Sequence, residues 1–275
     1  MPPQTDVADA LFTFIMDRGV SGQTLTVGLC GSQGSGKSTA AAEVARRLEG
    51  EGLKTALLSL DDLYLNRERR AVLARDVHPL LATRGVPGTH DVALGERVLD
   101  GLKQAETTAL PRFDKAQDEP LPAEDWPHVQ GPVDVILLEG WCVGAVAQTD
   151  AALMLPVNAL ERDEDPDGVW RRYANAALKD DYRRLFTRLD ALVLLAAPDF
   201  ATVVNWRKEQ EQALRFRLAA EGKTTARTMD DGAVERFVSH YERLTRHILA
   251  EMPAQADLTL SVDQHRRVVG SRSRA

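Results

Sequence analysis

The chain has 275 residues, 44% of them hydrophobic and 27% charged, an ordinary globular balance that allows one large domain or two small ones. Its formal net charge of −7 creates no overall field that favours nucleic acid or an anionic membrane, so neither is an expected partner. No apolar run approaches the roughly 20 residues needed to cross a bilayer, no secretory signal is recognisable, and the two cysteines, Cys30 and Cys142, form no metal-ligand spacing, so we expect a cytoplasmic protein.

The first predicted elements surround a glycine-rich turn. Apolar residues at helical spacing predict a leading helix over residues 6–16. The apolar run at residues 25–30 predicts a buried strand, and the Ala-rich run at residues 39–48 predicts a helix. Between them, Gly31–Thr39 has the sequence GSQGSGKST and fits G-x-x-x-x-G-K-[ST], the pattern of a phosphate-binding loop.

This strand–turn–helix setting is the one that phosphate binding requires. Successive backbone N–H groups of a glycine turn at a helix N-terminus point into one concavity, which suits a phosphate chain. Lys37 is expected to reach the β- and γ-phosphates and Ser38 to bind Mg²⁺. The motif indicates a nucleoside triphosphate and predicts a three-layer P-loop NTPase fold. The residues expected to bind the nucleotide are Gly31, Ser32, Gln33, Gly34, Ser35, Gly36, Lys37, Ser38 and Thr39.

Two aspartates follow the second predicted strand, which covers residues 55–60. Ligands of an open α/β sheet bind beyond the carboxyl ends of its strands. Asp61 and Asp62 are therefore well placed for catalysis, and one of them is expected to take a proton from a substrate hydroxyl. Aspartate also favours helix caps and surface turns, so a structural role is the alternative.

The stretch from residue 61 to 132 contains one clear helix, over residues 91–104, and is otherwise rich in Pro, Gly, His and charge. Long irregular connections of this kind are more often functional than idle. Two clusters stand out, RGVPGTHD at Arg84–Asp91 and PRFDK at Pro111–Lys115. Their side chains suited to an anion or a hydroxyl are Arg84, His90, Asp91, Arg112, Asp114 and Lys115. The alternatives are a helix cap for Asp91 and a solvated surface for the second cluster.

A carboxylate follows the third predicted strand, which covers residues 133–138. Glu139 stands next to a phosphate loop in the expected sheet, where such a residue commonly serves the metal directly or through water. Ser38 and Glu139 are thus the candidate Mg²⁺ ligands, and a surface glutamate is the alternative reading of Glu139. A polar, irregular stretch follows at residues 148–167.

The C-terminal half alternates between helices and strands again. The predicted elements are helix 168–189, strand 191–196, helix 202–220, helix 233–251 and a weaker strand 258–262. Arg207, Arg215 and Arg217 lie in the helix after the fourth strand and are candidates to close over the triphosphate as a lid, although helical arginines are usually solvated. Residues 264–275 are expected to be a basic, solvated tail. Together the elements predict one α/β domain with a mostly parallel five-stranded sheet flanked by helices.

The phosphate loop is followed, in this order, by LSLDDLYL, RGVPGTHDV, PRFDK and VDVILLEGW. This combination resembles the plant-type D-glycerate 3-kinase family, which belongs to the P-loop kinases together with phosphoribulokinase, uridine kinase and pantothenate kinase. The resemblance runs from the first strand to the helix that contains Val234 and Tyr241, nearly the whole chain. It implies an ATP-dependent kinase that phosphorylates a hydroxyl of a small metabolite, with D-glycerate the best candidate and 3-phosphoglycerate its product.

The resemblance also implies roles for individual residues. Asp61 aligns with the aspartate that serves as base in the wider kinase group, and Asp62 is its neighbour and a lesser candidate. Glu139 aligns with the acidic residue that helps to hold Mg²⁺. The acceptor is implied to bind at His90, Asp91, Arg112, Asp114 and Lys115.

One departure from the family pattern leaves the acceptor open. The plant enzymes follow PR[FY]DK with Gly-Arg-Gly-Asp-Arg, whereas Lys115 is followed here by AQDEPLP, which lacks two arginines near the expected acceptor site. A nucleoside, a sugar phosphate or a pantothenate-like molecule is the alternative acceptor. A P-loop switch or regulatory NTPase is a weaker alternative, because the fourth strand ends in APDF without a guanine-reading motif and no Leu-Ser-Gly-Gly-Gln sequence is present.

Overall fold

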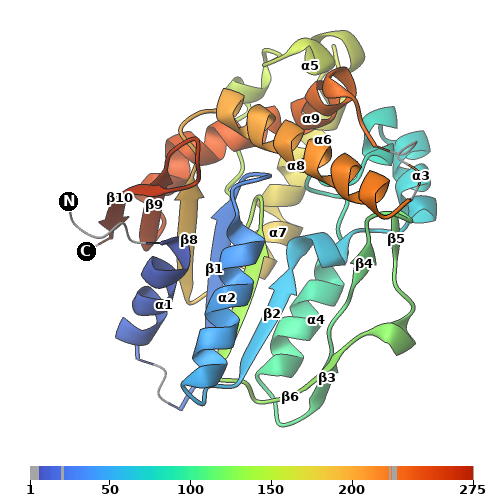
Figure 1. The fold of residues 1–275 in the computed structure, drawn as a ribbon. Helices are drawn as coiled ribbons and strands as arrows, with labels where there is room; N and C mark the ends of the chain where they lie inside the picture. The colour runs from blue at the N-terminus through green and yellow to red at the C-terminus, as the bar shows by residue number, and fades with distance from the viewer. Residues whose placement is uncertain (1–5, 20–21, 223, 225–227, 275) are drawn as a thin grey trace.

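A six-stranded, mostly parallel β-sheet forms the centre of the protein (Figure 1). The computed structural model describes residues 6–19, 22–222, 224 and 228–274. The strands are β1 (Leu25–Gly31), β2 (Thr55–Ser59), β7 (Val135–Gly140), β8 (Ala191–Ala196), β9 (Leu258–Val262) and β10 (Val268–Ser273), in the spatial order β10-β9-β8-β1-β7-β2. Neighbouring strands are parallel except β9 and β10. The predicted α/β class with a mostly parallel sheet is confirmed.

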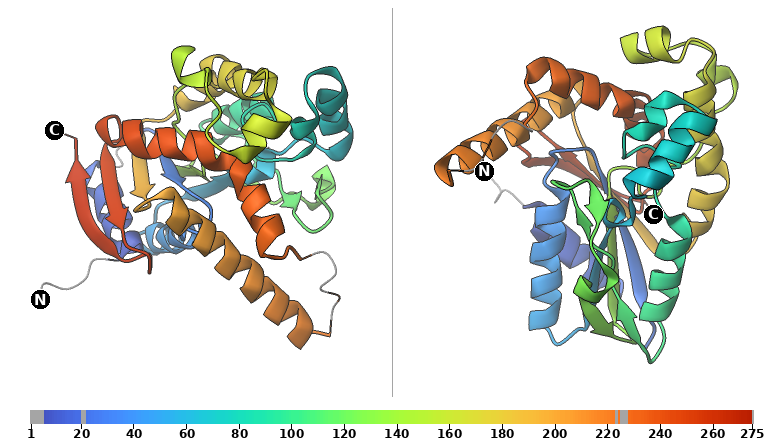
Figure 2. Two further views of the ribbon diagram at one scale, coloured as in Figure 1. Left: turned by 90° about the horizontal axis from the view of Figure 1, so that it is seen from above. Right: turned by 90° about the vertical axis from the view of Figure 1, so that its right-hand side faces the viewer.

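Helices cover both faces of the sheet and make three layers. They are α1 (Val7–Asp17), α2 (Lys37–Gly50), α3 (Arg67–Asp76), α4 (Val92–Leu102), α5 (Ala159–Glu164), α6 (Val169–Lys179), α7 (Asp181–Phe186), α8 (Phe200–Ala220) and α9 (Asp231–Glu251). Val27 and Leu29 of β1 pack with α1 and α2 in one apolar cluster, whereas Ile136 and Leu138 of β7 pack with α4 and α7 in another. The right-hand view of Figure 2 shows α2 and α4 on opposite sides of the sheet. Within the described ranges, no helix has the length and apolar character to cross a membrane.

The C-terminal segment differs from the predicted solvated tail. Residues 268–273 form β10, which pairs with β9 and raises the number of strands from the predicted five to six. Residues 269–273 are exposed, so β10 lacks the buried apolar side chains that mark the other strands. Polar and charged residues are typical of an edge strand, which keeps its side chains in water and is held by backbone hydrogen bonds.

Two helical predictions also need correction. The segment predicted as one helix over residues 168–189 is broken at Asp180, whose φ of −110° and ψ of −87° separate α6 from α7. The insertion at residues 61–132 holds α3 in addition to the predicted helix. Arg70 is the buried residue of α3, and the rest of that helix is polar or partly exposed, so no apolar stripe indicates it in the sequence.

Short elements complete the connections. Two small antiparallel pairs lie in the insertion, β3 (Thr107–Ala109) with β6 (His128–Gln130) and β4 (Phe113–Asp114) with β5 (Glu119–Pro120). The 3₁₀-helices are η1 (Leu60–Leu63), η2 (Pro79–Ala82), η3 (Ala123–Asp125), η4 (Ala151–Leu153) and η5 (Met252–Ala254). β4 lies within the PRFDK segment and contacts η1, directly beyond the carboxyl end of β2.

Candidate active site

The ends of three neighbouring strands form the candidate site. β7 lies between β1 and β2, and Glu139 of β7 is in register with Leu29 of β1 and Ser59 of β2. The phosphate loop after β1 (Gly31–Thr39), the turn after β2 and Glu139 therefore lie side by side at the carboxyl end of the sheet. This is the edge where ligands of open α/β sheets bind.

The phosphate loop has polar atoms that lack partners in the protein. Gly34 and Gly36 have left-handed φ values of +76° and +87°, which glycine adopts readily. α2 begins at Lys37 and its N-cap makes no side-chain hydrogen bond, so the N–H groups of its first turn are left for another acceptor. The buried atoms that make no hydrogen bond to any described residue include Ser32 Oγ, Gln33 Oε1 and Ser35 Oγ. Such a set of unpaired polar groups at a helix N-terminus fits a phosphate chain.

Ser38 and Glu139 lie together at the base of this loop. Ser38 Oγ donates to Glu139 Oε1 over 3.0 Å, and Lys37 Nζ lies 3.9 Å from Glu139 Oε2. Glu139 is 4% exposed, and its Oε2 has no hydrogen-bond partner among the described residues. No three His, Cys, Asp or Glu side chains of the described chain form a metal-holding group by themselves. A hydroxyl and a carboxylate nevertheless fit Mg²⁺, which commonly takes one or two protein ligands together with phosphate oxygens and water.

Replacement of Glu139 by Gln is expected to raise the Mg²⁺ concentration for half-maximal activity by about 10- to 100-fold, because the amide removes the negative charge at the metal position. The measurement is a Mg²⁺ titration of activity at fixed ATP. Glu49, an exposed residue of α2, provides the matched control Glu49→Gln. An unchanged Mg²⁺ requirement in Glu139→Gln would remove Glu139 from the metal site.

Asp61 lies in η1, directly after β2, and is held by two polar side chains. Tyr64 donates its hydroxyl proton to Asp61 Oδ1 over 2.6 Å, and Lys115 Nζ lies 2.6 Å from Asp61 Oδ2. Burial raises the pKa of Asp61, but the charges of Lys115 and Lys37 outweigh burial and lower the pKa of this carboxyl well below its ordinary value. Asp61 is therefore an ionised hydrogen-bond acceptor at neutral pH.

Asp62 contacts other residues of the PRFDK segment. Its Oδ1 accepts a hydrogen bond from the backbone N–H of Phe113 over 3.1 Å, and its Oδ2 lies 3.4 Å from the guanidinium of Arg112. Burial raises the pKa of Asp62. Asp62 thus joins the turn after β2 to the PRFDK segment, while the pairing of Lys115 with Asp61 forms a second link between the same two segments.

Arg84 completes a group of cations near these aspartates. Its guanidinium lies 5.4 Å from the ring centre of Phe113 and 5.9 Å from that of Tyr64, and it forms an ion pair with Asp118. Tyr241 of α9 donates to the backbone carbonyl of Arg84 over 3.0 Å. Folding therefore gathers three of the predicted acceptor residues, Arg84, Arg112 and Lys115, around η1.

The other predicted acceptor residues have structural partners. Asp91 accepts from the backbone N–H of Leu94 as the N-cap of α4 and pairs with Arg69 at 2.6 Å. Asp114 accepts from the N–H groups of Ala116 and Gln117 in a tight turn. The helix-cap alternative for Asp91 is thus what the structure shows, and neither carboxylate is left free of backbone partners.

His90 is buried between aromatic residues. Its Nδ1 is hydrogen-bonded to the Tyr182 hydroxyl, and its ring lies 4.7 Å from that of Tyr64, the partner of Asp61. Burial lowers the pKa of His90 to about 4, so the imidazole is neutral at pH 7. Its Nε2 has no partner within the described part of the chain, which leaves one ring nitrogen for a ligand or a water molecule.

The three candidate lid arginines lie along α8. Arg207 pairs with Glu211 at 2.8 Å and lies over the ring of Phe237. Arg215 donates to the Met229 carbonyl over 2.6 Å, and Arg217 is exposed. Trp206, next to Arg207 in the chain, packs against Gly34 of the phosphate loop. The lid role of these arginines stays a prediction.

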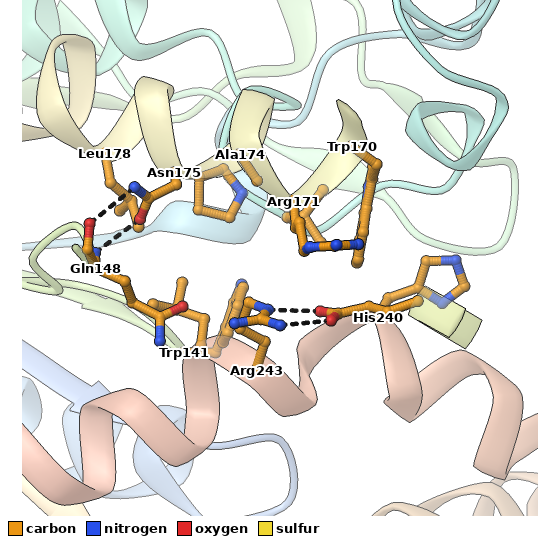
Figure 3. A pocket seen from close by; sticks show the side chains of 13 residues that line it. Trp141, Gln148, Trp170, Arg171, Ala174, Asn175, Leu178, His240 and Arg243 are labelled. Carbon is orange, nitrogen blue, oxygen red and sulfur yellow. Dashed lines mark hydrogen bonds and ion pairs between the residues drawn. The ribbon is translucent and has the colours of Figure 1, made fainter. Parts of the chain in front are cut away.

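A separate small cavity of about 30 Å³ lies between α6 and α9, and Val86 and Pro87 form part of its lining (Figure 3). Its charged groups are paired internally, Arg243 with Glu161 at 2.6 Å and Arg171 with Asp165 at 3.0 Å. Gln148 and Asn175 hydrogen-bond each other across its edge. Since both arginines are paired with carboxylates, this cavity differs from the group of cations around η1.

Sequence reasoning missed the aromatic residues that hold the site. Trp141 follows Glu139 and donates its indole N–H to the Gly85 carbonyl over 2.8 Å, and Tyr241 packs edge-on against it. Tyr64 and Tyr182 hold Asp61 and His90. Tyr64 and Trp141 had local signals, because Tyr64 follows Asp61 by one 3₁₀ turn and Trp141 lies two residues after Glu139, whereas Tyr182 and Tyr241 come from helices far away in the sequence.

Comparison with known proteins agrees with this geometry. A family model described as "Phosphoribulokinase / Uridine kinase family" matches residues 26–154. The uncharacterized kinase mug58 of Schizosaccharomyces pombe is 32% identical over 236 residues, which are 80% of this chain and 79% of that protein. The chloroplastic D-glycerate 3-kinase of Arabidopsis thaliana is 29% identical over 271 residues, 89% of this chain but 54% of the plant protein, so this chain spans about half of its length. The structure of D-glycerate 3-kinase from Cryptococcus neoformans is similar with a TM-score of 0.80 and 26% identity, covering 97% of this chain and 99% of that one.

Proposed function

We propose, from the premise that this chain belongs to the D-glycerate 3-kinase family of P-loop kinases, that it transfers the γ-phosphate of ATP to a hydroxyl of D-glycerate and forms 3-phosphoglycerate. The observation that carries the proposal is the position of Asp61. Its ionised carboxylate lies at the carboxyl end of the sheet, near Lys37 of the phosphate loop and within a group of cations.

The phosphate loop and its lysine bind ATP in this proposal. The N–H groups at the start of α2 and the ammonium of Lys37 stabilise the charge on the β- and γ-phosphates. Ser38 and Glu139 hold Mg²⁺, which neutralises charge on the phosphate oxygens. Asp61 accepts the proton of the acceptor hydroxyl as that oxygen approaches the γ-phosphorus.

The ion pair between Lys115 and Asp61 suggests how the acceptor is received. A hydroxy acid carries a carboxylate that competes with Asp61 for the ammonium of Lys115 and attracts the guanidinium of Arg112. When Lys115 turns to the acceptor carboxylate, Asp61 Oδ2 is freed for the acceptor hydroxyl. Acceptor binding and exposure of the base are thereby coupled through one lysine.

The segment after Lys115 favours a second candidate. Asp118 stands in the stretch where the plant pattern has arginines, and it pairs with both Arg84 and Arg70. Arg84 is therefore partly neutralised as an anion-binding group. An uncharged acceptor of the same kinase group, such as a nucleoside, is the alternative to D-glycerate.

An acceptor panel tests the proposed function. ADP release and the phosphorylated product are measured with D-glycerate, L-glycerate, glycerol, uridine and pantothenate. Glycerol keeps both hydroxyls of glycerate and carries an uncharged CH2OH group in place of the carboxylate, so it isolates the contribution of the cations. We expect D-glycerate to give the highest kcat/KM, with phosphate on the 3-hydroxyl. If uridine or pantothenate gives a higher kcat/KM than D-glycerate, that molecule is the acceptor and the D-glycerate proposal is wrong.

Replacement of Arg112 by Gln is expected to raise the KM for the acceptor about tenfold or more, because a charge-assisted hydrogen bond to the carboxylate is lost. The KM for ATP is expected to stay close to the wild-type value. Arg67→Gln is the matched control, since Arg67 is an exposed arginine of the same insertion. Equal increases in both KM values would instead place Arg112 on the triphosphate.

A further inference from the structure

The turn that connects β9 and β10 lies against the phosphate loop. Arg266 of this turn donates its Nε–H to the backbone carbonyl of Gly34 over 2.5 Å. Gly34 belongs to the phosphate loop that follows β1, and 232 residues separate the two partners in the chain. Figure 1 shows the turn at the upper end of β9 and β10, the end of the sheet that also carries the phosphate loop.

The guanidinium of Arg266 is held on two further sides by α8. It lies 5.2 Å from the ring centre of Trp206, and its Nη2 forms an ion pair with Glu209 at 2.7 Å. Trp206 is 1% exposed and donates its indole N–H to the Gln264 carbonyl over 2.7 Å. A Cβ atom at Gly34 would lie 2.6 Å from Trp206 Cβ. The phosphate loop, α8 and the hairpin turn therefore meet at one point.

The backbone at Arg266 is in a conformation that arginine rarely adopts. Its φ is +65°, in the left-handed region that favours glycine. Asp263 holds this turn, because its Oδ1 accepts from the N–H groups of His265 and Arg267 over 2.8 and 2.9 Å. Disfavoured backbone conformations that the surroundings maintain are concentrated at functional sites. Here the conformation aims the side chain of Arg266 at the phosphate loop.

We propose that Arg266 is a positioning residue of the nucleotide site and holds the phosphate loop in its binding conformation. Both polar groups of the Gly34–Ser35 peptide unit make hydrogen bonds. Its carbonyl accepts from Arg266, and its N–H, that of Ser35, donates to the Ser32 carbonyl over 3.2 Å. Because a peptide unit is planar, fixing the carbonyl also fixes the N–H of the next residue. A loop that is ordered before ATP arrives loses less entropy on binding.

The inference rests on the proposed binding of ATP at this loop and is independent of the acceptor. Its test is therefore the binding of MgATP without acceptor, measured by calorimetry, for Arg266→Asn and for the control Arg267→Asn. Asparagine tolerates the left-handed conformation, and Arg267 is an exposed neighbour in the same turn. We expect Arg266→Asn to raise the Kd and the KM for ATP about tenfold, the typical effect of losing one hydrogen bond of a charged group. The KM for the acceptor and the Arg267→Asn values should stay at the wild-type level.

A Kd for MgATP that is equal in Arg266→Asn and Arg267→Asn would overturn the positioning role. Equal increases in the KM values for ATP and acceptor would overturn it as well, because general loosening of the fold affects both. If Arg266→Asn does not fold, Arg266→Lys takes its place. Lysine can reach the Gly34 carbonyl but cannot keep all three contacts, so a partial increase in Kd supports the role and a Kd equal to that of Arg267→Lys contradicts it. A wild-type protein that fails to bind MgATP would instead overturn the proposed nucleotide site itself.

Discussion

Replacement of Asp61 by Asn is expected to lower kcat by about 10²–10⁴-fold, the usual contribution of a positioned general base. The KM for ATP should change little, because Asp61 lies in the turn after β2 and not in the phosphate loop. Asparagine keeps the size of the side chain and its hydrogen bond with Tyr64, so the fold should remain intact. Steady-state kinetics with saturating ATP and acceptor, together with the melting temperature, provide the measurement.

Asp62→Asn is the matched control for this prediction. Asp62 binds the Phe113 N–H and Arg112, contacts that connect the turn to the PRFDK segment. We expect its loss to lower kcat less and to affect the KM for the acceptor through Arg112. If Asp62→Asn is inactive and Asp61→Asn is active, Asp62 is the base and Asp61 is not. If neither substitution matters, the turn is structural and the base lies elsewhere.

Replacement of Lys37 by Ala is expected to lower turnover by roughly a hundredfold or more, because the variant lacks the ammonium whose positive charge stabilises the transferred phosphate. The same ammonium lies 3.9 Å from Glu139 Oε2, so its removal also leaves this buried carboxylate less compensated. Lys37→Arg restores a charge and separates the two effects. If Arg restores the melting temperature but not turnover, the geometry of the lysine at the phosphates is what catalysis needs.

Lys54, an exposed lysine before β2, supplies the control Lys54→Ala for nonspecific effects of removing a charge. Activity and melting temperature of this variant should match those of the wild-type protein. Near-normal turnover of Lys37→Ala would exclude the phosphate loop from the mechanism, whatever its effect on stability.

Local patterns predicted most of the fold, because buried strands and amphipathic helices leave a periodic signal in the sequence. The five apolar strands and the helices α1, α2, α4, α8 and α9 were found at nearly their observed positions. The polar helix α3 and the edge strand β10 carry no such signal. Arg70 anchors α3 by donating to the carbonyls of Leu65 and Ala82 and to Asp118, contacts that depend on segments outside the helix.

The sequence alone located the glycine-rich loop, the aspartates after β2 and the glutamate at the end of β7, since a glycine motif and a strand end are local features. Only the tertiary structure decided how the polar side chains are used. It pairs Asp61 with Lys115, 54 residues away in the chain, and brings Arg266 to Gly34, 232 residues away. Asp91 and Asp114 instead accept hydrogen bonds from nearby backbone N–H groups. The physical reason is that a side chain's partner depends on how distant elements pack around the sheet, and no local pattern carries that information.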